Sequence, residues 1–555
     1  MLSSMIAIDV YAKKQARLSP MSPDELVSYY RDLRSGHHPI LTESSSDSAL
    51  SHKCGLWVTA QLLDQWKNLT AQQRQEIQAL IRQTSLQKDT IIEHFHIFYD
   101  TSGLNTPALF DGTGAQIGDA LAYVDSVGAI FNHVWDVEIR ILGFSQPPFE
   151  IGQSHYNIYI SNLGNGNYGG TNPVDLISGT QPERYSSNID INNDFIGSSF
   201  FTKGIQALRV TAAHEFHHAI QFGYGWWGSD ERYAYELTST WMEDVVYTDV
   251  NDYYQYLPDY FVGFHVGLSF NSDNYGGYER CIWAHYLAKR FSPSIMRDVW
   301  TRMSTQPFLE STDAALVNIG SNLPTAFSEF TYWNYYTADR ADTVKYYPKG
   351  NHYPRFQPLQ KIVYNNGDVT VGGDVSPLSS SMYEFDLSSP DTLTAMIANV
   401  DVNGAEIGQT LTRRVDITLF SQNYPPPFHQ FENGLKARIA VADTSRWHDF
   451  FSQSSTVEYV IKRLSNLAPN PFHINTDQQL FLPVNEDEIG LAQVFFYSSS
   501  LSLVYTAEVN ITYQNKSMVI AVSGTGLTSK LSSGVFFIVA KTKKKDYQWK
   551  VSVIR

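Results

Sequence analysis

Apolar residues recur with helical periodicity in several parts of the first 350 residues. In one of these segments Thr70 is followed three residues later by Gln73, which is typical of a helix-starting capping box. Residues 1–48 lack such a pattern and are expected to be poorly ordered. The segments with the clearest helical spacing are residues 56–82, 117–135, 202–222, 280–291 and 324–336.

Apolar and polar residues instead alternate in a second set of segments, which predicts strands. Three of these segments lie among the helices, at residues 95–99, 156–160 and 187–192. Beyond residue 360 short strand patterns follow one another between Gly, Pro, Asn and Asp turns, as in a β-sandwich. These later strands are expected at residues 363–371, 382–387, 392–400, 415–420, 437–441 and 457–463.

These patterns predict a multidomain α+β protein. Residues 1–90 form an N-terminal segment, partly disordered with helices, that could be a propeptide. Residues 91–350 form a mixed helical and extended domain, residues 361–465 form a β-sandwich, and residues 466–555 form a smaller β domain.

Composition narrows the classes of protein to which the chain can belong. Its net charge is −16, with 40 Lys and Arg against 56 Asp and Glu, so it is a poor candidate for binding nucleic acid. No apolar run approaches the ~18 residues of a membrane span. Two cysteines in 555 residues exclude a disulfide scaffold and suit a secreted bacterial protein. Residues 1–12 are at best a fragment of a signal peptide, so the signal is incomplete or missing in this chain.

The strongest chemical signal is the sequence HEFHH at residues 214–218, which contains the H-E-x-x-H pattern. Residues four apart share a helix face, so His214 and His218 can bind one metal ion. Glu215 can accept a proton from a water molecule on that metal, since zinc lowers the pKa of such a water to ~7. The alternative is a buried helix whose histidines are satisfied by hydrogen bonds. The adjacent His217 is expected on the helix surface.

A catalytic zinc site needs a third protein ligand and one open position. Glu236 follows His218 by 18 residues, which leaves room for a glycine-rich turn and a second helix that returns to the metal. We expect Glu236 to be the third ligand. Glu243, two turns later on the same face, is an alternative ligand or a supporting residue, and Thr240 is a candidate to hydrogen-bond a ligand.

The sequence HEFHHAIQ at residues 214–221, followed by ELTSTWMED at residues 236–244, resembles the gluzincin branch of zinc metallopeptidases. More narrowly, the chain is similar to a family of secreted bacterial zinc metalloproteases known mainly from sequence. The resemblance covers about residues 50–350 and departs from the family at Leu237, where relatives usually have a small residue. Other matching pieces, in order, are HIFYDTSG (96–103), NYGG (167–170), SNIDINNDF (187–195) and TYWNYY (331–336).

The resemblance implies a zincin-like catalytic domain, with a twisted mixed sheet, an active-site helix and a helical C-terminal lobe. In such folds the edge strand of the sheet pairs with extended substrate, and residues 187–192 are the candidate. A Tyr or His from the later lobe usually stabilises the oxyanion. Tyr275, Tyr278 and His285 are the candidates here.

Cys54 lies upstream of the expected catalytic domain. Its thiolate could take the fourth position on the zinc and keep a pro-form latent. The alternatives are a buried free cysteine and a disulfide with Cys281.

The C-terminal region resembles the type IX secretion (type A) sorting domain and related Ig-like modules. The resemblance rests on the sequence NPF at residues 470–472, LSSGVFF at residues 531–537 and the final basic residue Arg555. It implies a small β-sandwich that engages the secretion machinery. The alternative is a plain accessory Ig-like domain, and either favours a secreted or cell-surface location.

Together these features predict a secreted zinc-dependent endopeptidase that hydrolyses peptide bonds through a zinc-bound water with Glu215 as general base. We expect one Zn²⁺ per chain, with structural Ca²⁺ as a further candidate ion, and a protein or peptide as substrate. One alternative is a non-catalytic cell-surface binding or adhesion protein on a zincin scaffold. Another is a metal-dependent hydrolase that acts on something other than peptides.

Overall fold

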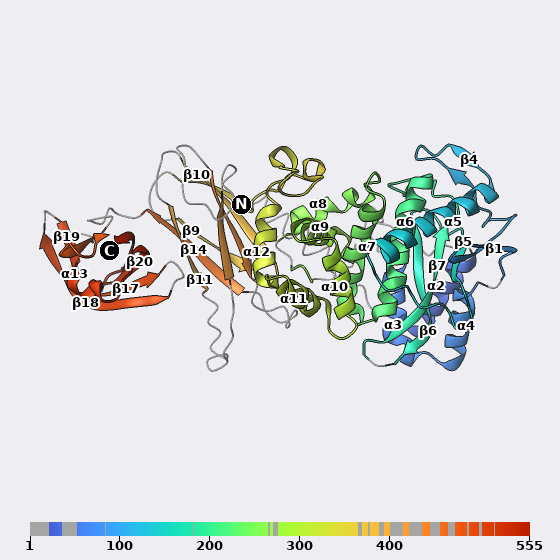
Figure 1. Ribbon diagram of the computed structural model, residues 1–555, viewed down its shortest axis with the longest axis horizontal. Helices are drawn as coiled ribbons and strands as arrows, with labels where there is room; N and C mark the ends of the chain where they lie inside the picture. The colour runs from blue at the N-terminus through green and yellow to red at the C-terminus, as the bar shows by residue number, and fades with distance from the viewer. Residues whose placement is uncertain are drawn as a thin grey trace.

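The protein is mixed α+β, with a helix-rich body and several separate sheets (Figure 1). This confirms the predicted α+β class. None of the helices in the described ranges is both long and apolar enough to cross a membrane. The computed structural model describes residues 21–35, 53–83, 85–179, 181–264, 267–269, 276–364, 369–375, 378–387, 393–399, 415–420, 436–443, 455–463, 472–484, 488–498, 502–514 and 517–555.

A five-stranded mixed sheet organises the first half of the chain. Its order is β1-β2-β5-β7-β6, in which β2, β5 and β7 run parallel while β1 and β6 pair antiparallel at the two edges. The central strands are buried almost throughout, as expected when both faces of a sheet are covered. The strands are β1 (Lys88–Ile92), β2 (Phe95–Tyr99), β5 (Tyr156–Ser161), β6 (Gly169–Ser178) and β7 (Arg184–Asn192).

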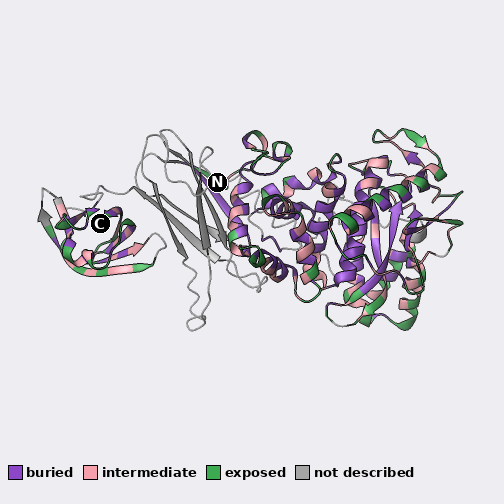
Figure 2. Ribbon diagram, in the orientation of Figure 1, coloured by how far each residue is buried: buried purple, intermediate pink, exposed green. Residues whose placement is uncertain are grey.

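Helix α6 (Gly204–Tyr224) packs against β7 at the centre of the molecule. Every residue from Val210 to Tyr224 is buried, which is the pattern of a core helix and not of an amphipathic surface helix (Figure 2). The helix ends at Gly225, whose φ of +145° favours glycine. The helix predicted at residues 202–222 is therefore confirmed to within two residues.

A helical lobe follows α6 and shares one continuous core with the sheet. Helix α7 (Arg232–Val246) packs directly on α6, and α9 packs on α7. The other helices of this lobe are η3 (Ser229–Glu231), η4 (Asp252–Gln255), α8 (Leu257–Gly263), η5 (Tyr278–Arg280), α9 (Cys281–Arg290), α10 (Ser294–Arg302), α11 (Phe308–Asn318), α12 (Leu323–Trp333), η6 (Ala338–Arg340) and η7 (Gly350–His352). Before α6, the helix α5 (Ala120–Trp135) and the π-helix η2 (Asp136–Ile141) lie between β4 (Gln116–Gly118) and β5 in the chain.

Three N-terminal helices form a small unit with a core of its own. They are α2 (Pro23–Ser35), α3 (Leu56–Gln65, continued by η1, Trp66–Asn68) and α4 (Ala71–Ile81). The capping box predicted at Thr70 is present. The expectation that residues 1–48 lack order is wrong for α2, because Leu26 and Tyr30 lie one turn apart and are buried against α3 and α4. Most of the other residues in that range lie outside the described part.

Beyond residue 360 two smaller sheets form. One has the order β12-β13-β10-β8 and the other the order β11-β14-β9. The single strand predicted over residues 363–371 is wrong, since β8 and β9 belong to different sheets. Their strands are β8 (Gln360–Tyr364), β9 (Val369–Val375), β10 (Ser380–Leu387), β11 (Leu393–Asn399), β12 (Val415–Phe420), β13 (Lys436–Asp443) and β14 (Ser455–Arg463).

The C-terminal region is one seven-stranded sheet of order β15-β21-β20-β17-β18-β19-β16 around its own buried core. Because β15 and β16 are neighbours in sequence but lie at opposite ends, the sheet curls nearly into a barrel. The predicted two-sheet sandwich is therefore replaced by a near-barrel. Its elements are β15 (Phe472–His473), β16 (Gln479–Pro483), β17 (Gly490–Ser498), β18 (Leu503–Gln514), β19 (Ser517–Ser523), α13 (Gly524–Thr528), β20 (Gly534–Lys541) and β21 (Asp546–Ile554).

The edge of the central sheet differs from the prediction. Residues 187–192 belong to β7, which lies between β5 and β6 and is not an edge strand. The edge beside α6 is β6, which pairs antiparallel with β7 and covers it. The sequence pattern could not separate the two strands, because alternation identifies a strand but not its neighbours.

Close packing of β6 on α6 depends on Gly169. A Cβ at this position would lie 2.9 Å from the Asp190 carbonyl oxygen and from Thr211 Cγ2, and 3.1 Å from Glu215 Cγ. The neighbouring Gly170 would place a Cβ no closer than 3.6 Å to any atom. Two adjacent glycines of one strand therefore differ sharply in the space around them.

We predict that Gly169→Ala lowers the free energy of unfolding by about 1–3 kcal/mol, because the added methyl group overpacks the contact between β6 and α6. The matched variant Gly170→Ala should stay within about 0.5 kcal/mol of the parent. Chemical denaturation of both variants measures the difference. Equal effects of the two substitutions would contradict this account of the packing.

Candidate metal centre

Four side chains that can bind a metal converge between α6, α7 and the N-terminal segment. They are His214 and His218 of α6, Glu236 of α7, and Cys54. One ligand atom from each lies within 4.8 Å of the others, and all four residues are buried. Within the described part of the chain, no other group of three or more such residues meets this condition. Helix α7 returns beside α6 after the 223–228 turn, which places Glu236 opposite the two histidines.

Hydrogen bonds on the far side of each ring determine the tautomers of both histidines. His214 Nδ1 lies 2.8 Å from Glu243 Oε1, and His218 Nδ1 lies 2.6 Å from Gln221 Oε1. The Gln221 amide is oriented by its own Nε2, which donates to the Tyr235 carbonyl at 3.0 Å. Both acceptors require a proton on Nδ1, so in the neutral rings Nε2 carries a lone pair.

The two Nε2 atoms nevertheless face each other at 3.1 Å. Glu236 Oε2 lies 3.2 Å from the Nε2 of His214 and 3.4 Å from that of His218. With both rings neutral, three lone-pair atoms so close together repel one another unless a proton or a metal cation lies between them. A tetrahedral ion with ligand distances of ~2.0–2.1 Å sets its donor atoms about 3.3 Å apart, which is the spacing seen here.

The buried glutamates and histidines of the cluster shift one another's pKa values. Burial alone would lower the pKa of His214, but hydrogen bonds to Glu236 and Glu243 outweigh it and raise the pKa to about 9. Burial would likewise raise the pKa of Glu236, but hydrogen bonds from His214 and His218 lower it to about 2. The site therefore stabilises positive charge at its centre even before a metal binds.

A second layer of charge supports Glu243. Lys53 Nζ lies 2.7 Å from Glu243 Oε2 and 2.7 Å from Asp252 Oδ2, with all three side chains buried. Tyr168 donates a hydrogen bond to Asp252 Oδ1 at 3.3 Å. Glu243 thus links the His214 ring to a buried lysine, so it is a supporting residue in this structure.

Glu215 lies beside the four donors without being one of them. The Thr171 hydroxyl donates to Glu215 Oε2 at 2.8 Å, and Cys54 Sγ lies 3.7 Å from the same oxygen. Burial raises the pKa of the Glu215 carboxyl above its ordinary value, while the nearby histidines partly oppose that rise. A carboxyl group held in this way can accept and return a proton near neutral pH.

The structure brings one of the three predicted oxyanion candidates to the site. The Tyr278 ring contacts His214 with centroids 5.7 Å apart, and the Tyr278 hydroxyl accepts a hydrogen bond from the Cys54 amide at 3.2 Å. His285 is placed elsewhere: it stacks on Tyr253 and faces Asp244, and burial lowers its pKa to about 3. Tyr275 lies outside the described residues.

Three further expectations from the sequence are corrected. His217 is fully buried and not on the helix surface, and its Nδ1 bonds the buried Glu138 Oε2 at 2.7 Å. The Thr240 hydroxyl is buried and makes no hydrogen bond to a ligand within the described structure. Cys54 and Cys281 are both free, so the alternative of a disulfide between them is also wrong.

Several contributing residues were missed in the sequence. Gln221 could have been found, because it lies one turn after His218 on the same helix. Thr171 and Lys53 offered no such signal, since they reach the site from β6 and from the segment before α3. Ser239, whose Oγ lies 3.1 Å from His218 Nδ1, is likewise visible only once α6 and α7 are packed.

No protein-family model matches the chain, and no curated protein is significantly similar to it in sequence.

We predict that Glu243→Gln weakens metal binding about 10–100-fold, because it removes the carboxylate that orients and polarises His214. Competition with a chromophoric chelator measures the affinity. The matched control is Glu138→Gln, which alters the other glutamate–histidine pair of α6 and should leave the affinity unchanged. Equal losses in the two variants would contradict the role given to Glu243.

The metal-free protein should lose stability as the pH rises. The folded-state pKa of His214, about 9, exceeds its ordinary value of 6.5, so its stabilising charge is fully present below 6.5 and lost on passing 9. The melting temperature of chelator-treated protein, compared with that of His214→Asn across this range, isolates the effect. The gap between the two should narrow with rising pH, and a constant gap would contradict the assignment.

Proposed function

We propose that the protein is a zinc-dependent endopeptidase. The observation that carries the proposal is the pair of imidazole Nε2 lone pairs that face each other and Glu236 at the spacing of a tetrahedral ion, with Glu215 beside them. Imidazole and carboxylate donors in this number suit Zn²⁺. When bound, zinc would polarise the peptide carbonyl and acidify a water molecule at neutral pH.

The residues around the ion divide the remaining work. Glu215 takes a proton from the attacking water and returns it to the leaving amine, and the Thr171 hydroxyl keeps its carboxylate in place. Tyr278, whose ring contacts His214, is positioned to donate a hydrogen bond to the oxyanion. His214, His218 and Glu236 hold the ion, while Glu243 and Gln221 keep the two rings in the metal-binding tautomer.

The arrangement of elements is consistent with a zincin-like domain of the gluzincin type. A mixed sheet precedes the H-E-x-x-H helix, and the next helix supplies the glutamate ligand. Leu237 is fully buried next to that glutamate and packs in the main core, so the departure from the family pattern is accommodated.

We also propose that the C-terminal near-barrel is an export module. Its core, which includes Phe496 and Trp549, is separate from the core of the body that carries the candidate metal centre. This independence supports a role that does not involve the metal. Of the matching pieces, only Phe472 of NPF lies within the described residues, and it begins β15. LSSGVFF spans the turn before β20 and the first four residues of that strand. A plain accessory domain is the alternative.

Glu215→Gln should reduce hydrolysis of a peptide-substrate panel to about background, a loss on the order of 10²-fold or more, while one zinc per chain stays bound. The control is Glu329→Gln, the same substitution at a residue of α12 that forms a salt bridge with Arg290 of α9. This variant should retain activity. Mass spectrometry of the products measures peptide hydrolysis, and elemental analysis measures the zinc bound per chain.

The outcomes separate the proposed function from its alternatives. Bound zinc without hydrolysis of any peptide, even after removal of the N-terminal helices, would favour the non-catalytic binding protein. Hydrolysis confined to non-peptide esters or amides would favour another metal-dependent hydrolase. Absence of bound metal at neutral pH would overturn the proposal.

A further inference from the structure

Residues 53–55 run alongside the first residues of β6 and deliver Cys54 to the cluster. Cys54 pairs with Gly169 in a parallel bridge, Tyr168 donates its amide to the Lys53 carbonyl at 3.0 Å, and Gly55 donates to the Gly169 carbonyl at 3.1 Å. The segment therefore lies on the open edge of the sheet, next to Glu215. This is the position where a peptide could pair with β6 and reach the catalytic groups.

The fourth donor changes the character of the site. Two histidines and one glutamate leave an ion with an open position, whereas the addition of Cys54 gives four protein ligands and closes it. A closed site is typical of a structural metal. Glu215, however, faces the Cys54 sulfur at 3.7 Å and is held by Thr171, an arrangement that a purely structural site does not need.

Lys53 anchors the same segment by charge. Its ammonium group lies between Glu243 and Asp252 and is fully buried. Glu243 also orients His214, so the segment is attached both to the donor cluster and to the residue that supports it. Without Lys53, the buried carboxylates of Glu243 and Asp252 would lose the cation that neutralises them both. Another cation or water would then be favoured at this position.

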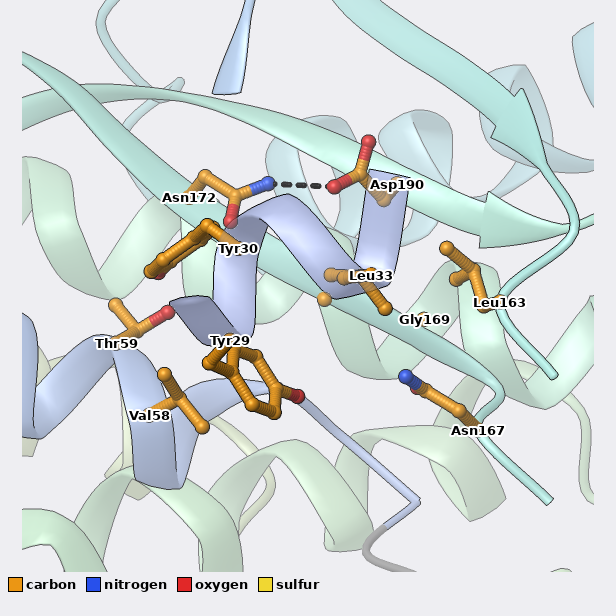
Figure 3. A pocket seen from close by; sticks show the side chains of 12 residues that line it. Tyr29, Tyr30, Leu33, Val58, Thr59, Leu163, Asn167, Gly169, Asn172 and Asp190 are labelled. Carbon is orange, nitrogen blue, oxygen red and sulfur yellow. Dashed lines mark hydrogen bonds between the residues drawn. The ribbon is translucent and has the colours of Figure 1, made fainter. Parts of the chain in front are cut away.

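The helices that carry this segment have a small core of their own. The core of α2, α3 and α4 includes Leu26, Trp57 and Ile77, while the face of α3 that bears Leu56 and Ala60 packs into the main core. A pocket remains at the boundary and is lined by Tyr29 and Leu33 of α2, Val58 of α3 and Gly169 of β6 (Figure 3). The unit joins β1 through residues 85–87, of which Ser85 and Gln87 are exposed, so the connection is accessible to a protease.

We propose that residues 21–35 and 53–83 act as an inhibitor within the chain, which keeps the metal centre latent by supplying Cys54 as the fourth ligand and by covering the β6 edge. The inference rests on the proposed function and adds its regulation. A cut in the exposed connection lets the unit leave. The sulfur–metal bond then breaks, and solvent supplies both the proton for the freed thiol and the molecule that takes the vacated position.

The ligand role is tested without any activity. Full-length protein loaded with Co²⁺ in place of zinc should have a thiolate-to-cobalt charge-transfer band in the near ultraviolet. Cys54→Ser should lose the band, and the matched control Cys281→Ser, another buried free cysteine, should keep it. Absence of the band in the parent, or its survival in Cys54→Ser, would overturn the proposal.

Latency is tested with a specific protease site inserted between Ser85 and Leu86. Cutting should abolish the cobalt band and raise peptide hydrolysis about tenfold or more, because one position on the ion becomes open. Uncut Cys54→Ser should be more active than the uncut parent but less active than the cut parent, because the unit still covers the β6 edge, whereas uncut Cys281→Ser should match the uncut parent. A band that persists after the cut and separation of the unit would make Cys54 a permanent ligand and overturn latency.

The two proposals fail in different ways. If no form hydrolyses peptides but the band disappears on cutting, the proposed function fails while the displaceable ligand stands. If the cut and uncut forms hydrolyse peptides equally, the proposed function stands and the inhibitor is overturned.

Discussion

The structure depends on how it neutralises carboxylates that it buries between α6 and α7. Glu236, Glu243 and Asp252 are all removed from water, and an isolated buried carboxylate costs several kcal/mol or more. Lys53 and the two imidazole rings of the H-E-x-x-H pattern are the groups that face them. The need to neutralise these carboxylates explains where α7, the N-terminal segment and the metal-binding donors are placed.

This arrangement of buried charges requires the backbones of neighbouring elements to pack closely around α6. Helix α6 is surrounded on all sides, so its histidines cannot turn toward solvent, and their orientation is left to hydrogen bonds from neighbouring elements. Gly169 lets β6 approach α6 closely enough for Thr171 to reach Glu215. A loosely packed helix with the same residues would not hold the two Nε2 atoms at a metal-binding spacing.

Two networks meet at the metal centre and serve different purposes. The first network consists of the hydrogen bonds from Glu243 and Gln221 to the rings of His214 and His218. It would orient these two ligands whether or not the fourth position on the ion is filled. The other runs through residues 53–55 and occupies that position and the sheet edge. Because Glu243 belongs to both, removal of the N-terminal unit would change the charge around His214 as well as access to the ion.

Features that depend on neighbouring residues of one element could be predicted from the sequence. The helical spacing of residues 202–222 and the four-residue separation of His214 and His218 predicted a metal-binding helix face, and Thr70 with Gln73 predicted the start of α4. These features depend on neighbours along one helix, where 3.6 residues per turn relates sequence to space directly. Residues 95–99 were likewise predicted as a strand, and β2 has those bounds.

Only the tertiary structure decided which elements became neighbours. It placed β6 and not β7 at the edge, buried His217 against Glu138, moved His285 away from the cluster and closed the C-terminal strands into one near-barrel. It also brought Cys54 and Lys53 to helices more than a hundred residues away in sequence, and it brought Thr171 to Glu215, 44 residues further along the chain. The pairing of strands and the packing of distant side chains depend on long-range contacts that periodicity cannot encode, so the sequence determined the donors and the fold determined what surrounds them.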